Sequence, residues 1–261
     1  MITSTRNARI VAALRLHTRA HRDADRRFLV EGAQAVGEAL AAGPGTLVTL
    51  FAREADHPLA RQATGQGVEV VAVGEAVMER LAGTVTPQGL VGIAAYRDVA
   101  LDALPRTPTC VVVLHEVRDP GNAGTILRSA DAAGADAVVF AGSTVDPYNA
   151  KVVRASAGSI FHLPVVRSAA TADALAALRD RGCAVLAMAG DGEDDLYDAP
   201  LDRPLAFLFG NEAQGLDAAT RGLADAVVRI PIPGRAESLN LAAAATVCLF
   251  EWARRRPSAP R

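Results

Sequence analysis

Short apolar runs recur through the second part of the chain, and each is separated from the next by a stretch of helical character. Residues 111–114 read VVVL, residues 184–188 read AVLAM and residues 205–209 read LAFLF. Strands that are apolar on both faces are typical of a parallel sheet covered by helices on both sides. We therefore expect an α/β domain from Cys110 onward. Its further strands are expected at residues 137–140, 163–166 and 227–230.

The first part of the chain predicts a smaller α/β unit. Strand-like runs alternate with helical stretches, and an alanine-rich helix is expected to end near Ala42. The stretch DVALDALPRTPT contains two prolines and little periodicity, which indicates a linker. The fold class is thus α/β in both parts. The expected domains are residues 1–97, a linker at 98–109, and residues 110–261; the strands of the first domain are expected at 28–32, 46–52, 67–73 and 89–96.

Composition excludes several classes of protein. The cysteines Cys110, Cys183 and Cys248 are far apart and show no CxxC spacing, so we expect buried thiols rather than a disulfide framework or a zinc site. No run of 18 apolar residues is present, and no apolar segment follows the polar start MITSTRNARI. We expect a cytoplasmic protein without a membrane or metal partner.

The N-terminal segment is strongly basic, although the whole chain has a net charge of -2. Residues 1–30 carry seven arginines against two aspartates, a local charge of +5. The arginine spacing predicts one helical stripe whose opposite side docks through Ile10, Val11 and Leu14. Such a stripe can bind RNA phosphates; an ordinary solvated helix face is the alternative. The expected RNA contacts in this segment are Arg6, Arg9, Arg19, Arg22, Arg26 and Arg27.

Three glycine-bearing loops follow three of the expected parallel strands, at the sheet edge where ligands of such sheets bind. The first is DPGNAG, which opens a helix carrying Arg128; the second is GNEAQGL; the third is IPIPGRAESLN. Each loop alone reads equally well as a turn or a helix cap, with Ser238 as the expected N-cap of the last helix. No loop carries GxGxxG, GxxxxGK[ST] or a nucleophile elbow, and the histidines lack metal-ligand spacing.

Taken in order, NxGxxxRxAxxxGA, LFGNExxGL and IPxxGxxESLNLxxA resemble the three motifs of the SpoU/TrmH family, RNA ribose 2'-O-methyltransferases of the SPOUT class. The resemblance runs from Cys110 to the C-terminus. The preceding unit is similar to the L30e-like RNA-binding domain of rRNA-directed members. The resemblance implies S-adenosylmethionine as methyl donor, 23S ribosomal RNA as substrate, a homodimer, and a C-terminal trefoil knot made by the second and third loops. Pro231, Pro233 and Gly234 are expected to steer the threaded third loop around the cofactor.

The resemblance also implies the roles of individual residues. Arg128 is expected at the ribose hydroxyl, where a guanidinium that stays protonated suits orientation and charge stabilisation better than proton removal. Arg154 is expected to contact RNA, and a contact of His115 with ligand is left open. The other expected catalytic residues are Asn122, Glu212, Ser238 and Asn240. The expected cofactor contacts are Leu208, Gly210, Asn211, Gly215, Ile230, Ile232, Pro233, Ser238, Leu239 and Ala189.

Three alternatives remain at this point. A noncatalytic RNA-binding or ribosome-assembly protein could keep the fold, although intact Asn122, Arg128 and Glu212 disfavour it. A tRNA ribose methyltransferase is disfavoured because such enzymes often lack the N-terminal extension. A Rossmann-type oxidoreductase is disfavoured by the missing nucleotide fingerprint.

Overall fold

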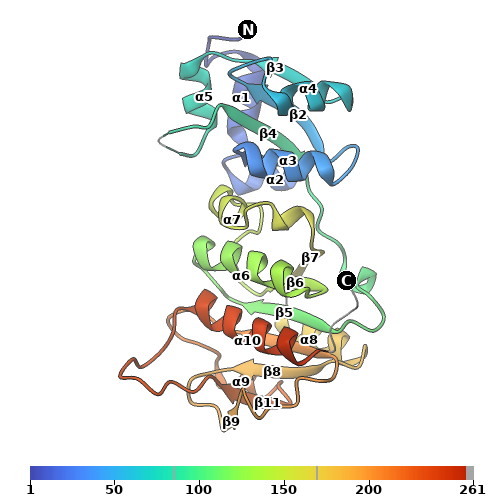
Figure 1. Cartoon of the computed structure of the whole chain (residues 1–261), viewed down its shortest axis with the longest axis vertical. Coiled ribbons are helices and arrows are strands. Elements are labelled where there is room, and N and C mark those ends of the chain that lie inside the picture. The colour runs from blue at the N-terminus through green and yellow to red at the C-terminus, as the bar shows by residue number, and fades with distance from the viewer. Residues whose placement is uncertain (85, 169, 257–261) are drawn as a thin grey trace. The chain divides into compact units, whose positions relative to one another are not determined.

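The computed structural model describes residues 1–84, 86–168 and 170–256, and the chain divides into two compact units (Figure 1). Unit 1 consists of Met1–Arg97 together with Tyr148–His162. Unit 2 consists of Asp98–Pro147 together with Leu163–Arg261. The segment 148–162 therefore packs with unit 1, although it lies inside the second of the two expected domains.

Among the described residues of unit 1, four strands form one sheet in the order β1-β4-β2-β3. Strand β4 is antiparallel to β1 and β2, and β3 is parallel to β2. The strands lie where the sequence predicts them. They are β1 (Arg27–Glu31), β2 (Leu47–Ala52), β3 (Glu69–Ala72) and β4 (Leu90–Ala95); the helices are α1 (Ala8–Arg15), α2 (Arg19–Asp25), α3 (Ala33–Ala41), α4 (Pro58–Gly65), α5 (Glu75–Leu81) and α7 (Ala150–Ala155), with the short 3-10 helix η2 (Ser159–Phe161).

The prediction of one continuous arginine stripe is wrong, because the basic segment forms two helices. Helix α1 ends at Arg15 and α2 begins at Arg19, with Thr18 extended between them. Ile10 is buried as expected, whereas Val11 is 40% exposed.

Arg22 is 4% exposed and does not face solvent with its neighbours. Its Nη1 donates to the carbonyl oxygens of Leu16 and His17, both at 2.9 Å. Carbonyl groups at a helix end lack partners within the helix, and a buried guanidinium satisfies two of them here. Arg22 is thus a structural residue, and its assignment to the RNA-binding set is corrected.

Aromatic side chains join the segment Tyr148–His162 to the rest of unit 1. The ring of Tyr148 lies 4.7 Å from that of Phe28 and 3.9 Å from that of Tyr96, and its hydroxyl accepts a hydrogen bond from the Arg97 amide at 2.8 Å. On α7, the Nη1 of Arg154 lies 3.4 Å from a carboxylate oxygen of Glu31, whose side chain is only 10% exposed. Arg154, predicted to contact RNA, therefore also compensates a largely buried carboxylate.

Within the described part of unit 2, seven parallel strands form one sheet in the order β7-β6-β5-β10-β8-β11-β9. Six strands confirm the sequence prediction; β9, of two residues, was not expected. Strand β7 starts only after Pro164, which has no amide hydrogen to donate to the sheet. The strands are β5 (Cys110–His115), β6 (Ala137–Ala141), β7 (Val165–Ser168), β8 (Ala184–Met188), β9 (Asp194–Asp195), β10 (Leu205–Phe209) and β11 (Ala226–Arg229).

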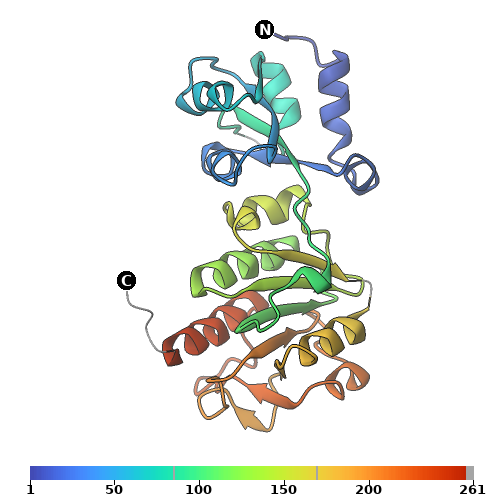
Figure 2. The same cartoon turned by 90° about the vertical axis from the view of Figure 1, so that its right-hand side faces the viewer.

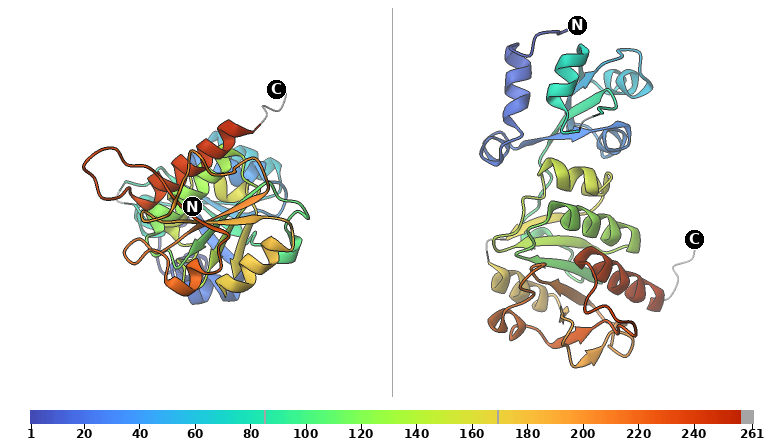
Figure 3. Two further views of the ribbon diagram at one scale, coloured as in Figure 1. Left: turned by 90° about the horizontal axis from the view of Figure 1, so that it is seen from below. Right: turned by 90° about the vertical axis from the view of Figure 1, so that its left-hand side faces the viewer.

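Helices cover both faces of this sheet. Helices α6 (Pro120–Ala133) and α10 (Leu241–Arg255) lie together on one face, and α8 (Thr171–Arg179) lies on the other (Figures 2 and 3). In β5, Val111 and Val113 belong to the same core as Leu175 of α8. The near-continuous apolar strands of the sequence are explained by this burial on both faces. A short helix, α9 (Ala218–Arg221), follows the loop after β10.

The stretch expected as a linker, residues 98–109, packs on unit 2. The Val99 amide donates to the Val165 carbonyl at 2.9 Å, and the side chain of Leu104 is 4% exposed within the core of this unit. Residues Leu101–Ala103 form the 3-10 helix η1. The low periodicity of this stretch reflects an irregular path over the unit.

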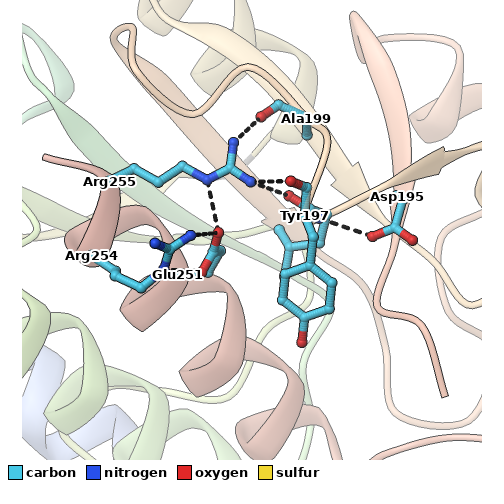
Figure 4. Close-up of polar contacts among 7 residues, drawn as sticks. Asp195, Tyr197, Ala199, Glu251, Arg254 and Arg255 are labelled. Atoms are coloured by element: carbon cyan, nitrogen blue, oxygen red, sulfur yellow. Dashed lines mark hydrogen bonds and ion pairs between the residues drawn. The ribbon is translucent and has the colours of Figure 1, made fainter. Parts of the chain in front are cut away.

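The end of α10 is fixed to the segment that follows β9 (Figure 4). The Nη1 of Arg255 donates to the Ala199 carbonyl at 2.8 Å, and its Nη2 donates to the Tyr197 carbonyl. Glu251 accepts from Arg254 at 2.8 Å and from Arg255 at 2.7 Å. The hydrogen bond from Arg254 is the largest cause that lowers the pKa of Glu251 to about 2, so this carboxylate stays charged.

All three cysteines are buried free thiols, as predicted. Burial raises the pKa of Cys183 to about 11 and that of Cys248 to about 12, and it raises the pKa of Cys110 well above its ordinary value. These thiols are therefore protonated at neutral pH. In the described part of the chain, no helix is both long enough and apolar enough to cross a membrane.

Candidate functional site

The loops after β5, β10 and β11 leave the sheet at the same edge, because all these strands are parallel. A cavity of about 470 Å³ opens beside the strand ends. Its size lies within the range of small-molecule sites. It is lined by residues 188–190, 209–212, 215, 221, 228–232, 236–239, 241 and 244.

Most of the predicted cofactor contacts line this cavity. Two do not: Leu208 is fully buried in the sheet core, because side chains alternate along β10 and the next residue, Phe209, reaches the cavity. Pro233 is exposed beyond the last lining residue of its loop segment, Ile232. The predicted residues that line the cavity are Ala189, Gly210, Asn211, Gly215, Ile230, Ile232, Ser238 and Leu239.

The loop after β10 is a tight turn closed by backbone hydrogen bonds. The amide of Asn211 donates to the Gly215 carbonyl at 3.0 Å, and the Gly215 amide donates back at 2.8 Å. A Cβ on Gly210 would lie 2.4 Å from the Gly215 backbone, and Gly215 itself has a φ of +66°. Both glycines are therefore required by the geometry of the turn.

The carboxylate of Glu212 connects this turn to the loop after β5. It accepts hydrogen bonds from the amides of Arg118 at 3.1 Å and Asp119 at 2.9 Å. It also accepts one from the side-chain amide of Asn122 at 3.2 Å. Burial raises the pKa of Glu212, but these hydrogen bonds together outweigh burial and lower it below its ordinary value. The carboxylate is ionised at neutral pH.

Asn240 brings the third loop into the same network. Its Nδ2 donates to the Oδ1 of Asn122 at 3.0 Å, while its Oδ1 accepts from the amides of Ala242 and Ala243. Asn240 is thus the N-cap of α10, and the expectation that Ser238 takes this place is wrong. Ser238 instead lies exposed at the cavity wall.

Arg128 lies on the exposed side of α6, whose opposite side buries Ile126 and Leu127. Within the described residues, its guanidinium makes no hydrogen bond or ion pair. Helix α6 is held to α10 by a hydrogen bond of 2.7 Å between Ser129 and Thr246. Arg128 is therefore an available cation on a rigidly held helix, but it does not line the cavity.

His115, at the end of β5, is also not among the residues that line this cavity. Its Nδ1 lies 2.7 Å from the hydroxyl of Thr171, and its Nε2 lies 3.6 Å from a carboxylate oxygen of Asp217. The side chain is only 12% exposed. Its contacts connect β5, the start of α8 and the loop before α9. The structure therefore gives no support for a contact between His115 and a ligand.

Sequence reasoning missed Arg221 and Glu237, which line the cavity as well. Glu237 lies within the quoted third motif and could have been included. Arg221 follows the second motif by several residues, and its position depends on an ion pair with Asp191 from another loop, at 2.9 Å. No local pattern in the sequence indicates that pairing.

The residues present fit the cofactor that the motif resemblance implies. Apolar side chains and close-approaching backbone suit a flat nucleoside, and the ionised carboxylate of Glu212 suits a sulfonium cation. Among the described residues, no group of three or more His, Cys, Asp or Glu side chains is placed to hold a metal ion. The arrangement can bind a small cofactor and hold polar groups beside it, which is a positioning task.

The chain matches the SpoU rRNA Methylase family over residues 109–250 and the MRM3-like substrate binding domain over residues 7–92. It is 32% identical over 249 residues to the 23S rRNA (guanosine(2553)-2'-O)-methyltransferase RlmP of Bacillus subtilis. That similarity covers 95% of this chain and 97% of the relative.

Two solved structures with bound cofactor are similar along nearly the whole chain. The AdoMet-bound rRNA methyltransferase from Sinorhizobium meliloti has a TM-score of 0.88 and 37% identity, with 98% of each chain covered. The SpoU methyltransferase AviRb from Streptomyces viridochromogenes, in complex with AdoMet, has a TM-score of 0.88 and 32% identity, with 96% of this chain and 98% of that chain covered.

The hydrogen bonds of Glu212 yield a testable prediction. In Glu212→Gln, an amide nitrogen replaces one acceptor, so the amides of Arg118 and Asp119 cannot both keep their bonds. We expect NMR signals of these two amides to shift and their hydrogen exchange to accelerate by about tenfold, the loss of roughly one charged hydrogen bond. Glu237→Gln, in the exposed third loop, is the matched control and should leave both amides unchanged.

The pH dependence of the hydrogen bonds to Glu212 has a definite direction. A lowered pKa means that the carboxylate stabilises this network at neutral pH and loses that effect as the pH falls through the lowered value. In the unsubstituted protein, both amide signals should therefore move only at pH values below the ordinary glutamate range. A midpoint at or above the ordinary glutamate value would contradict the assigned hydrogen bonds.

Proposed function

The chain belongs to the SpoU rRNA methylase family, and from this we propose that it transfers the methyl group of S-adenosylmethionine to a ribose 2'-hydroxyl of 23S ribosomal RNA. The observation that carries the proposal is the meeting of three loops at one sheet edge through Glu212, Asn122 and Asn240, beside a cavity that fits the cofactor. The names of the relatives support an rRNA substrate. Action on ribosomal RNA also leads us to propose a cytoplasmic protein.

The chemistry divides between the cofactor and the chain. When bound, S-adenosylmethionine supplies a methyl group attached to a positively charged sulfur, and this sulfur is a good leaving group because it departs as a neutral thioether. The carboxylate of Glu212 attracts that positive charge, Ser238 supplies a hydroxyl in the cavity wall, and Asn240 is joined to Glu212 through Asn122. Arg128 orients the ribose hydroxyl or its neighbouring phosphate and stabilises negative charge as it develops on the oxygen. The proton of the hydroxyl passes to solvent water.

We propose the trefoil knot as part of this site. Strand β10 lies between β5 and β8, and the loop after it lines the same cavity as residues 230–232 and 236–239. The chain then enters α10, which packs on α6 on one face of the sheet. A loop that crosses this edge twice needs backbone that bends without clashes, which Pro231, Pro233 and Gly234 supply.

We propose that unit 1 binds the RNA. Arg9 and Arg19 are exposed and pair with acidic side chains of the same unit at 2.7 and 3.4 Å, and the Arg26 guanidinium lies 4.9 Å from the Tyr96 ring centre. Arg6 and Arg27 are exposed, and their side chains have no hydrogen-bond or ion-pair partner within the described residues. These two are the strongest candidates for phosphate contacts.

We propose a homodimer that uses the outer face of α10. This helix buries Ala245, Cys248 and Trp252 against its own unit. Its other side presents an apolar row of three residues, of which Phe250 is 49% exposed. The spacing of the row matches one side of a helix. It consists of Ala243, Val247 and Phe250.

Methyl transfer and cofactor binding should separate in Arg128→Ala. We expect methyl transfer from labelled S-adenosylmethionine to 23S rRNA to fall at least about 100-fold, because charge stabilisation at the acceptor oxygen is lost. Affinity for S-adenosylhomocysteine should stay within a few-fold, since Arg128 does not line the cavity. Arg106→Ala, another exposed arginine without a side-chain partner in the described residues, is the control and should keep activity.

The same assay decides between substrates. Transfer to 23S rRNA but not to tRNA is expected for the unsubstituted protein. Cofactor binding without transfer to any RNA would favour a noncatalytic protein, and transfer to tRNA alone would overturn the assignment of the RNA class. Near-normal turnover of Arg128→Ala would mean that its role is wrongly assigned.

Phe250→Glu should convert the dimer into monomers, because a charged side chain would be buried at the exposed aromatic residue of the apolar row. Multi-angle light scattering at the assay concentration measures this directly. The control is Arg256→Glu, an exposed position beyond the end of α10, which should leave the measured mass unchanged. A monomeric unsubstituted protein with full activity would refute the dimer.

RNA binding by unit 1 can be measured through its salt dependence. Deleting the first 27 residues is unsuitable, because Ile10, Ala13 and Leu16 belong to the core of unit 1. In the double variant Arg6→Ala/Arg27→Ala, the slope of log affinity against log salt should fall by about 0.7 to 0.9 per lost phosphate contact. Arg106→Ala is again the control; equal slopes for both variants and the parent would mean that Arg6 and Arg27 are only solvated.

A further inference from the structure

The segment 189–193 begins in the cavity wall and is held by side chains from two neighbouring elements. Ala189 and Gly190 line the cavity, and the Ala189 amide donates to the Val228 carbonyl at 3.0 Å. The Nη1 of Arg229, on β11, donates to the carbonyls of Gly192 at 2.7 Å and Glu193 at 2.8 Å. This wall is therefore fixed to β11 along most of its length.

Gly192 allows the wall to approach β11 closely. A Cβ at this position would lie 2.7 Å from the Val228 carbonyl carbon and 2.8 Å from the Arg229 nitrogen, both of them backbone atoms. No flexible side chain could move aside to make room. The position of this wall is thus determined by backbone packing at Gly192 and by polar contacts elsewhere.

Arg221 connects this wall to the opposite one. Its Nη1 donates to the Asp191 carboxylate at 2.9 Å, and its Nε donates to the Leu216 carbonyl at 3.1 Å. Leu216 directly follows Gly215, which lines the cavity on the side of the β10 loop. One guanidinium therefore bridges the two loops and itself lines the cavity between them.

The two ends of the cavity differ in chemistry. The network of Glu212, Asn122 and Asn240 is anchored to the loop after β5, whereas the Arg221–Asp191 pair joins the loops after β10 and β8. Strands β5 and β8 flank β10, so the two groups connect the β10 loop to neighbours on opposite sides. The apolar side chains of Met188, Ala189 and Ile230 lie at the β8 and β11 end.

We propose that Arg221 and Asp191 are positioning residues that set the width of the cavity at its nucleoside end. This proposal rests on the proposed function: the charged sulfonium and amino-acid part of the cofactor belong beside Glu212, which leaves the flat, largely apolar adenosine for the opposite end. Arg221 and Asp191 act there by holding two loops at the spacing that the adenosine requires. They govern cofactor affinity and leave the transfer step to the residues around Glu212.

The chain contains a matched ion pair outside the cavity. The Nη2 of Arg179 lies 3.4 Å from the Asp225 carboxylate and also donates to the Leu223 carbonyl. The exposed fraction of its side chain is 34%, compared with 32% for Arg221. Arg179 does not line the cavity. Removing either arginine therefore removes a similar set of surface contacts, but only one of them faces the cofactor.

The test measures binding of S-adenosylhomocysteine and of 5'-methylthioadenosine, which lacks the amino-acid part, by titration calorimetry on the full chain. In Arg221→Ala, the dissociation constants of both ligands should rise by the same factor, at least about fivefold. Asp191→Asn should do the same to a smaller extent, and the double variant should show no further loss. Arg179→Ala should leave both constants unchanged. The turnover number at saturating S-adenosylmethionine should stay within about twofold in Arg221→Ala while the Michaelis constant rises.

Each possible result bears directly on the proposed role of Arg221 and Asp191. Unchanged constants in Arg221→Ala would overturn the inference, and so would weakening of S-adenosylhomocysteine alone, which would assign Arg221 to the amino-acid end. Equal weakening in Arg179→Ala would mean a general loss of stability. Asp191 is exposed at the surface, so Asp191→Asn keeps the test decisive if Arg221→Ala does not fold. If the unsubstituted protein bound neither ligand, the proposed function itself would fail.

Discussion

The site depends on one carboxylate, because Glu212 accepts hydrogen bonds from the loop after β5 while it belongs to the loop after β10. Through Asn122 this connection continues to Asn240, which also caps α10. Three loops are thereby fixed at one sheet edge, although the joined residues are 90 and 118 positions apart in sequence. A parallel sheet brings its loops to one edge, but only such contacts determine their spacing.

Much of this arrangement could be predicted from local sequence. Apolar runs such as AVLAM and LAFLF identify strands buried on both faces, and the order of the three loops identifies the sheet edge. Gly210 and Gly215 lie in the second of the glycine-bearing loops, and both line the cavity. Each of these features is determined by residues close together in the sequence, so a short segment is enough to predict it.

Other features depend on partners distant in sequence and could not be predicted. The burial of Arg22 follows from carbonyl groups left open where α1 ends, a position that the continuous helical spacing did not indicate. The segment 148–162 joins unit 1 because Tyr148 stacks on Tyr96 and Phe28. Strand β9 has two residues and no apolar pattern, and it exists because β11 offers a free edge.

The arginines show most clearly why residue type alone does not reveal function. Arg22 satisfies buried carbonyls, Arg255 fixes the end of α10, and Arg221 bridges two loops across the cavity. Arg128 makes no such contact within the described residues and remains available for a ligand. The guanidinium group has several donors in a fixed plane, so it can bridge separate acceptors or bind an incoming phosphate. Which of these it does depends on the acceptors that the fold supplies, and for Arg22, Arg221 and Arg255 the fold supplies backbone carbonyls.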